Sequence, residues 1–351
     1  MKKCNSVINK YQSGITLTFG IAAFSLLIAQ VNWLQSHAIG ALTLAILFGI
    51  VIGNTLYPKI AENSAHGVLF SKQRLLQLGI IFYGFRLTFD DISHVGMQGV
   101  VIDAVVLMST FAIAWAVGRK VFKLESNTVI LIGAGSSICG AAAVMATEPV
   151  VRGRAEQVSV AVSTVLVFGT ISMLLYPALF QWNLSWSLLP TSAEAFGIFT
   201  GSTVHEVAQV VAAANPLGDT ASNTAVITKM VRVIMLAPFL VALSIYIART
   251  RTVESIDDKQ KPKITIPWFA LIFVLVTGIN SLNIIPKNIV AGAIHLDTLF
   301  LAMAMAALGL GTHVSAIKKA GLKPLLLGGI LLIWLIVGGT LINNSVMTWS
   351  I

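Results

Sequence analysis

The stretch Gly135-Ser-Ser-Ile-Cys-Gly-Ala-Ala-Ala-Val144 decides the fold, and a second version of it follows as Gly201-Ser-Thr-Val-His-Glu-Val-Ala-Gln-Val210. In each, a glycine and two hydroxyl residues interrupt an apolar segment, and small, helix-compatible residues follow. Hydrocarbon offers no partner for the backbone groups that such a break frees, so breaks persist only inside protein or beside a cavity. A helix N-terminus there presents free N–H donors and about half a positive charge, which suits an anion. The two breaks therefore predict a transport site.

The composition is that of a membrane protein. Of 351 residues, 56% are hydrophobic and 11% are charged, against about 25% charged in a soluble domain. We expect one membrane domain over residues 1–351 and no cleaved signal peptide. The net charge of +9 comes from basic residues in short connections between apolar runs, so it indicates topology in a lipid bilayer and not nucleic-acid binding.

Apolar runs predict an all-α polytopic protein with 9 to 11 transmembrane segments, depending on whether the broken segments cross. The runs are 14–31, 38–56, 74–90, 97–118, 127–148, 156–181, 192–214, 221–248, 266–284, 288–313 and 321–343.

Loop charges predict the orientation. With a cytoplasmic N-terminus, the connections on that side hold most of the Lys and Arg residues, including Lys59, Lys72 and Arg74, whereas Arg152 and Arg154 fall outside. If 127–148 and 192–214 are re-entrant hairpins, Arg152 and Arg154 become cytoplasmic, and the two hairpins enter from opposite faces. This inverted repeat is favoured over full crossing with an unwound middle, and a weak similarity between 84–96 and 309–321 points the same way.

Charges inside apolar segments need a reason, because one at a helix centre costs about 2.5 to 3.5 kcal/mol. Lys229 and Arg232 lie roughly 12 to 17 Å into their segment, three residues apart and on one face. We expect them to face the substrate; the alternative is that they tie their helix to backbone carbonyls or to a carboxylate such as Asp103. Arg86, near the end of its segment, can snorkel or pair with Asp90.

In the second break, Thr203 and Glu206 fit a capping box, with Thr203 as the N-cap. His205 titrates near neutral pH, and with Gln209 it could hold an oxyanion or carry a coupled proton. The hydroxyls of the two breaks are expected to stand beside the freed N–H groups. The predicted substrate-binding set is Gly135, Ser136, Ser137, Gly201, Ser202, Thr203, His205, Lys229 and Arg232, with Glu206 and Asp103 as coupling candidates.

The run from Gly133 to Ala143, the segment from Gly201 to Ala213 and Lys229-Met-Val-Arg-Val-Ile-Met-Leu-Ala-Pro238 resemble the YeiH-type family of bacterial inner-membrane proteins, which are designated sulfate exporters. The resemblance covers essentially the whole chain. It implies a secondary transporter related to the cation/proton antiporter and bile-acid transporter group, with inverted repeats and discontinuous helices. The resulting expectation is export of a small oxyanion such as sulfate or sulfite by alternating access.

Other functions stay open. Asp103 or Glu206 could bind the ion of a cation/proton antiporter, Ser136 or Ser137 with His205 could form an intramembrane hydrolase, and a passive channel is a further alternative. We expect no enzyme, no cofactor and no metal site, because Cys4 and Cys139 are the only cysteines and no ATP-binding loop is present. A homodimer is an open alternative to a monomer.

Overall fold

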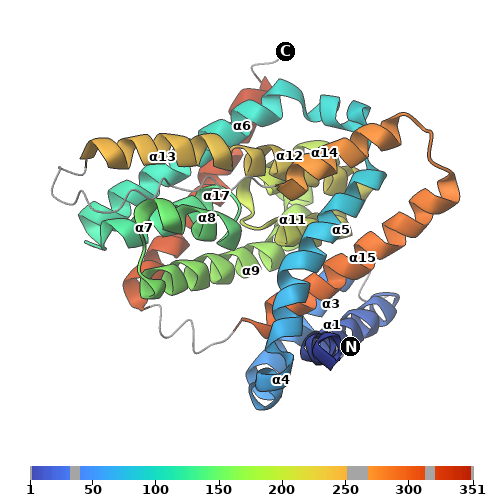
Figure 1. Cartoon of the computed structure of the whole chain (residues 1–351). Helices are drawn as coiled ribbons and strands as arrows, with labels where there is room; N and C mark the ends of the chain where they lie inside the picture. The colour runs from blue at the N-terminus through green and yellow to red at the C-terminus, as the bar shows by residue number, and fades with distance from the viewer. Residues whose placement is uncertain (1, 32–39, 251–267, 313–320, 349–351) are drawn as a thin grey trace.

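The computed structural model describes residues 2–31, 40–250, 268–312 and 321–348. These residues form helices and no strand, and six helices are long and apolar enough to cross a membrane. The all-α membrane fold is thereby confirmed. Figure 1 shows two groups of helices: blue and orange helices from near the two ends of the chain on one side, and teal to yellow helices with the red α17 on the other.

We name these groups the scaffold bundle and the hairpin bundle. The scaffold bundle contains α1 (Lys2–Ile28), α3 (Ala41–Thr55), α4 (Tyr57–Phe70), η1 (Ser71–Leu75), α5 (Leu76–Tyr83), η2 (Gly84–Arg86), α14 (Trp268–Ser281) and α15 (Lys287–Leu310). The hairpin bundle contains α6 (Phe89–Ala116), η3 (Val117–Val121), α7 (Ser126–Ser137), α8 (Ala141–Val151), α9 (Ala155–Trp186), α10 (Ala193–Thr203), α11 (Val207–Ala214), η4 (Asn215–Leu217), α12 (Asp219–Ile234), α13 (Leu236–Thr250) and α17 (Leu322–Thr348).

The predicted start of the third apolar segment is wrong. The segment expected to begin at residue 74 begins at Tyr57, since α4, η1 and α5 follow one another without a gap. Lys59, Lys72 and Arg74 therefore lie in a helical segment and not in a loop. The reason is that α4 is amphipathic: Ser64, Gly67 and Val68 are among its few buried residues and the rest is mostly polar or exposed, so a search for continuous apolar runs does not find it.

The first broken segment, α7 and α8, is a re-entrant hairpin. Arg154, just after α8, places a guanidinium nitrogen 2.7 Å from the carboxylate of Glu125, just before α7. Inside the hairpin the two arms pack closely, because a Cβ added to Gly135 would lie 2.7 Å from a methyl group of Val144. The segment thus enters and leaves by the same face, which we call the first face.

The second broken segment, α10 and α11, is also a hairpin. A Cβ added to Gly197 would lie 2.7 Å from the carbonyl oxygen of Ala221, and one added to Gly201 would lie 2.4 Å from that of Ala225. The residue numbers rise together, so α10 and α12 run parallel. The chain must return along α11 to the level where α10 began before α12 can start.

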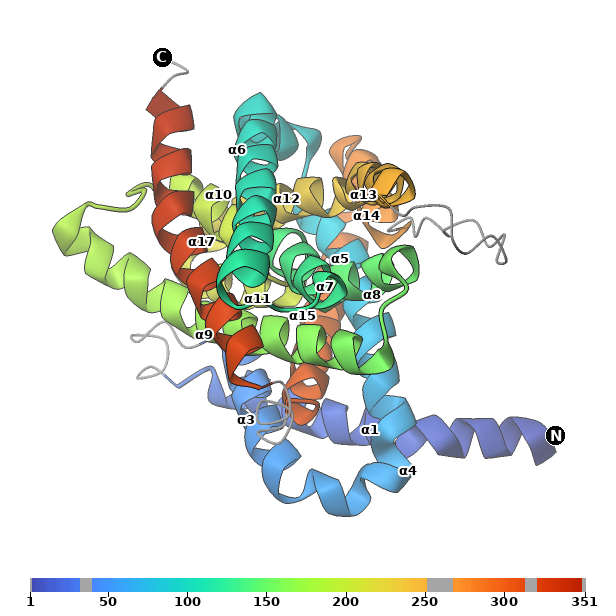
Figure 2. The ribbon, with the colours of Figure 1, turned by 90° about the vertical axis from the view of Figure 1, so that its left-hand side faces the viewer.

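Helix α9 shows that the hairpins enter from opposite faces. It starts beside the ends of the first hairpin and runs antiparallel to α10, with Tyr176 bonded to Thr203 at 2.8 Å and the ring of Phe180 4.9 Å from that of Phe196. Figure 2 shows α9 passing α7 and α8 and continuing to the far side, where the chain turns back into α10. The base of the second hairpin defines the second face.

A unit of half-helix, break, half-helix and crossing helix therefore occurs twice in opposite senses, as α7 to α9 and as α10 to α13. This arrangement agrees with the predicted inverted repeat. The similarity between 84–96 and 309–321 remains a prediction, because residues 313–320 lie outside the described residues.

The hairpin topology predicts a labelling pattern. With Cys4 and Cys139 replaced by alanine, single cysteines at Glu125 and Arg154 are expected to react with a membrane-impermeant maleimide from one face, and a cysteine at Ser187 from the other. Labelling of right-side-out and inverted vesicles checks this. Reaction of the Glu125 and Arg154 positions from opposite faces would show that 127–148 crosses the membrane.

Candidate functional site

The tips of the two hairpins meet in the middle of the hairpin bundle. The first break runs from Ile138 to Gly140, and Gly140 has a φ of +73°. The second break runs from Val204 to Glu206, and both of these residues have extended backbone. A helix end leaves backbone groups without intrahelical partners. The breaks free carbonyls at the ends of α7 and α10 and N–H groups at the starts of α8 and α11.

The pattern of one glycine and two hydroxyl residues lies on the carbonyl side of each break, contrary to expectation. Gly135 to Ser137 form the last turn of α7, and Gly201 to Thr203 form the last turn of α10. All six residues are buried. Their position beside freed carbonyls means that they are not the donors at a helix N-terminus that the sequence suggested.

Most of these hydroxyls are already bonded within their own helices. Ser202 and Thr203 both donate to the carbonyl of Phe199, and Ser137 donates weakly to that of Ala134 at 3.5 Å. Ser136 differs, because its buried hydroxyl has no hydrogen-bond partner. A role of the four hydroxyls in substrate binding stays a prediction, with Ser136 the one that is free to take it.

Lys229 and Arg232 join the two tips. The ammonium of Lys229 donates to the carbonyls of Ile138 and Val204, each at 2.7 Å. Arg232 donates through Nε to the carbonyl of Ser137 at 2.6 Å and through Nη1 to that of Ser202. Each cation thus bonds both hairpins, which is the alternative in which they tie α12 to backbone carbonyls. Their positive charges also compensate the negative ends of α7 and α10.

Glu206 lies at the other side of the breaks, where half-helices begin and their N-terminal ends carry partial positive charge. It is the N-cap residue of α11, and its backbone N–H donates to Oε1 of Gln209 at 3.1 Å, so the predicted box with Thr203 as N-cap is wrong. The helix that contains Thr203 ends there and does not begin. The same carboxylate accepts a hydrogen bond from the N–H of Ala141, the first residue of α8, at 3.2 Å. One carboxylate therefore lies at the N-termini of two half-helices from opposite hairpins.

Two further predicted residues lie buried nearby without hydrogen bonds. Both ring nitrogens of His205 and both carboxylate oxygens of Asp103 lack partners, and Arg232 keeps one free guanidinium nitrogen. Asp103 is near enough for electrostatic interaction with Arg232 and Lys229. The salt bridge that the sequence offered as an alternative does not form, since neither oxygen has a bonded partner. No hydrogen bond joins His205 to Ser136 or Ser137.

A pocket that mixes charged and hydroxyl side chains with apolar ones lies between the two bundles on the side of the first face. Its volume is about 490 Å³, and the exposed Ala155 at the start of α9 places it at the surface. Lys72 from η1 and Gly311 beyond α15 supply the scaffold side. The hairpin bundle supplies Met145, Glu148, Gly153, Ala155, Val158, Ser159, Val162, Ser163 and Leu166. Met145 is about one helical turn from the break.

Lys72 is a candidate site residue that the sequence reasoning missed. It lines the scaffold side of the pocket, within electrostatic range of Glu206. It lies in the π-helical turn η1, and such turns are frequent at functional sites. In the sequence, the only indication of this position is a positive charge close to an apolar run, and such a charge predicts membrane orientation equally well.

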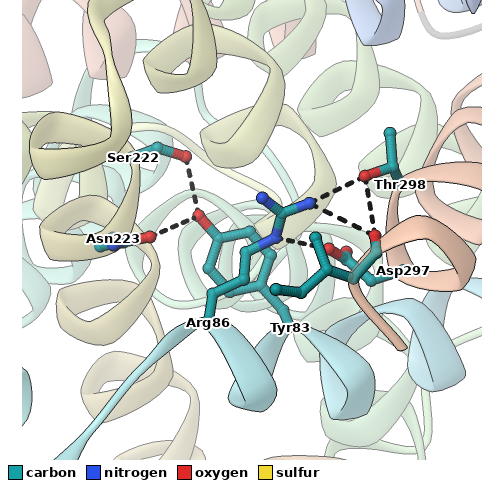
Figure 3. Close-up of polar contacts among 7 residues, drawn as sticks. Tyr83, Arg86, Ser222, Asn223, Asp297 and Thr298 are labelled. Atoms are coloured by element: carbon teal, nitrogen blue, oxygen red, sulfur yellow. Dashed lines mark hydrogen bonds and ion pairs between the residues drawn. The ribbon is translucent and has the colours of Figure 1, made fainter. Parts of the chain in front are cut away.

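On the side of the second face, the bundles are in direct contact (Figure 3). The hydroxyl of Tyr83 on α5 lies 2.8 Å from that of Ser222 and 3.1 Å from the side-chain oxygen of Asn223, both on α12. Arg86 bonds Asp297 at 2.6 Å and lies over the ring of Tyr83. The predicted pairing of Arg86 with Asp90 is replaced by this contact with α15.

Comparisons with known proteins agree with this architecture. A family model described as Conserved hypothetical protein 698 matches residues 13–328. A UPF0324 membrane protein of Pseudomonas aeruginosa is 58% identical, covering 95% of this chain and 93% of the relative. A UPF0324 membrane protein of Yersinia pestis is 56% identical, covering 96% of this chain and 93% of the relative. The UPF0324 inner membrane protein YeiH of Escherichia coli K12 is 52% identical, covering 99% of this chain and 98% of the relative. The chain is therefore a membrane protein of the UPF0324 family.

Proposed function

We propose that the protein is a secondary transporter that exports a small inorganic oxyanion, such as sulfate or sulfite, across the bacterial inner membrane by alternating access. The site is the region of the two hairpin tips. Opposed broken helices that meet in the middle of a bundle are typical of transporter sites near the membrane midplane. The N-terminus would be cytoplasmic, which makes the first face the cytoplasmic one.

The distribution of charge at the tips carries the preference for an anion. Lys229 and Arg232 compensate the negative ends of α7 and α10. The positive end of α8 binds the carboxylate of Glu206, the N-cap residue of α11. A region that already holds one carboxylate oxygen on a backbone N–H at a helix start has the geometry to hold an oxyanion.

The contacts between the bundles supply the two access states. In this proposal the pocket between the bundles is the entry from the first face, and the contact of Tyr83 with Ser222 and Asn223 keeps the second face closed. A rotation of the hairpin bundle that breaks the Tyr83 contact and closes the pocket would expose the tips to the other side. An inside-negative potential favours anion export by about 2.3 kcal/mol per charge per 100 mV.

Removal of the Tyr83 hydroxyl is expected to shift this equilibrium. Tyr83→Phe loses two hydrogen bonds that hold the second face closed, worth about 0.5 to 1.5 kcal/mol each, so the pocket-open state should become roughly fivefold to 150-fold less favoured. A Ser163→Cys reporter in the pocket should then react correspondingly more slowly with maleimide. Tyr57→Phe, on the same helical segment, is the control and should leave the rate unchanged; an equal rate in Tyr83→Phe would contradict closure by this contact.

A cation/proton antiporter is the second candidate, and Asp103 is the observation that favours it. Its buried carboxylate has no hydrogen-bond partner and could bind a cation or a proton. Asp103→Asn should abolish transport under this alternative. Under anion transport, flux should survive that substitution, because Asp103 is not at the start of α8 or α11.

The test of the proposed function is uptake of radiolabelled sulfate and sulfite into proteoliposomes, with and without a pH gradient, beside proton movement driven by sodium or potassium. Saturable anion flux supports the proposal. Absence of flux for both anions, together with cation-driven proton movement that Asp103→Asn abolishes, would establish the antiporter instead.

A further inference from the structure

We propose that Glu206 is a built-in competitor of the transported anion: its carboxylate occupies the anion position at the start of α8, and the substrate binds by displacing it. The inference rests on the proposed function and adds a chemical reason for proton coupling. A small dianion and the Glu206 carboxylate seek the same backbone donors, so both cannot hold them at once.

The geometry shows how closely the carboxylate is fitted to that position. Its Oε1 accepts from the N–H of Ala141 at 3.2 Å. A Cβ added to Gly140 would lie 2.2 Å from Cγ of Glu206, so only glycine leaves room for this side chain. Glu206 reaches across from the second hairpin to the first, and its withdrawal would leave the start of α8 open without any change inside the first hairpin.

Two buried polar groups, one in each hairpin, have no hydrogen-bond partner among the described residues. Gln209, whose Oε1 accepts from the backbone of Glu206, has an unpartnered Nε2, and Ser136 has an unpartnered hydroxyl. A carboxylate has two oxygens and can satisfy few donors. A tetrahedral oxyanion has four, and so can accept from more of the donors that surround the break.

Charged and titratable groups from several elements lie within electrostatic range of Glu206. Lys72 approaches from the scaffold bundle, Lys229 lies on α12, and Cys139 lies in the first break. His205 is adjacent in the chain. Lys72 belongs to the pocket, so it is placed to receive the incoming anion while Lys229 remains bonded to backbone carbonyls.

Displacement links anion binding to protonation. A deprotonated Glu206 that leaves the N–H of Ala141 becomes an unpaired buried charge, whereas a protonated one leaves at much lower cost. Anion affinity should therefore fall as pH rises through the titration of Glu206, by up to about tenfold per pH unit for one linked proton. Binding of the anion and uptake of the proton would favour each other.

The experiment measures binding by the melting temperature of the full-length protein purified in detergent. Sulfate and thiosulfate are the probes, because both stay dianions from pH 5.5 to 8.0, and sodium gluconate holds the ionic strength constant. Wild type is compared with Glu206→Gln, with Glu206→Asp, and with Glu148→Gln, which removes an acid from the same pocket without touching α8's first N–H. Apparent affinities come from the shift in melting temperature with concentration.

The expected result is an affinity in wild type, Glu206→Asp and Glu148→Gln that is at least about tenfold weaker at pH 8.0 than at pH 5.5, with a change below about threefold in Glu206→Gln. Equal pH dependence in Glu206→Gln and wild type would overturn this inference and leave the proposed function standing. No stabilisation of wild type by either dianion at any pH would count against the proposed function itself, and this inference would fall with it.

Discussion

Arg232→Met is expected to abolish anion flux and to lower the melting temperature of the purified protein by roughly 10 °C. Arg232 donates to Ser137 in one tip and to Ser202 in the other, so its loss leaves buried carbonyls of both hairpins without their donor. Breaking a buried charged contact typically costs about 3 to 5 kcal/mol, and each kcal/mol corresponds to about 2 to 4 °C in a large domain. Circular dichroism and proteoliposome flux measure the two effects.

Two variants make this result specific. Arg74→Met removes an exposed arginine from η1 and should change neither quantity by much. Arg232→Lys keeps the charge but replaces the planar guanidinium and its several donors with one ammonium. It should therefore restore less than half of the decrease in melting temperature that Arg232→Met causes. A stable Arg232→Met protein with full flux would mean that the tips are held together by something else.

Gly140→Ala has the second-largest expected effect. The residue has φ +73°, which costs an L-residue about 1 to 2 kcal/mol, and its new methyl would lie 2.2 Å from Cγ of Glu206. Glu206 must then leave the start of α8, and the partly buried N–H of Ala141 loses its acceptor at a further cost of about 1 to 3 kcal/mol. We expect a loss of roughly 2 to 5 kcal/mol in stability and at least tenfold in flux.

Gly321→Ala is the matched control for this substitution. Gly321 also has a positive φ of +82°, but a Cβ there would meet nothing within 4 Å. The control therefore carries the backbone strain alone, and the difference between the two variants measures displacement of Glu206. If the free energy of unfolding and the anion flux decrease equally in both variants, the close fit between Gly140 and Glu206 does not contribute to function.

Much of the fold could be predicted from the sequence, because hydrocarbon constrains it strongly. Apolar runs located most helices, and the basic residues Arg152 and Arg154 favoured hairpins over full crossings. The pair between Arg154 and Glu125 gives the same topology. The amphipathic α4 was missed because only part of its surface is buried.

The polarity of the site could not be predicted in the same way. Whether a helix ends before or after a Gly-Ser-Ser sequence depends on which partners the freed groups find in three dimensions. Here α7 continues through Ser137 because Arg232 and Lys229, nearly a hundred residues later in the chain, cover the carbonyls at its end. The sequence does not predict the position of Lys72 for the same reason, because its proximity to Glu206 arises from packing between the two bundles.

The central claim, anion transport through the hairpin tips, is tested most directly by electrical recording from proteoliposomes on a solid-supported membrane. A step of sulfate or sulfite onto wild-type protein should give a saturable transient current with the sign of anion movement, and Arg232→Met should give none. The claim is contradicted if anion steps give no current while sodium or potassium steps give a proton current that persists in Arg232→Met.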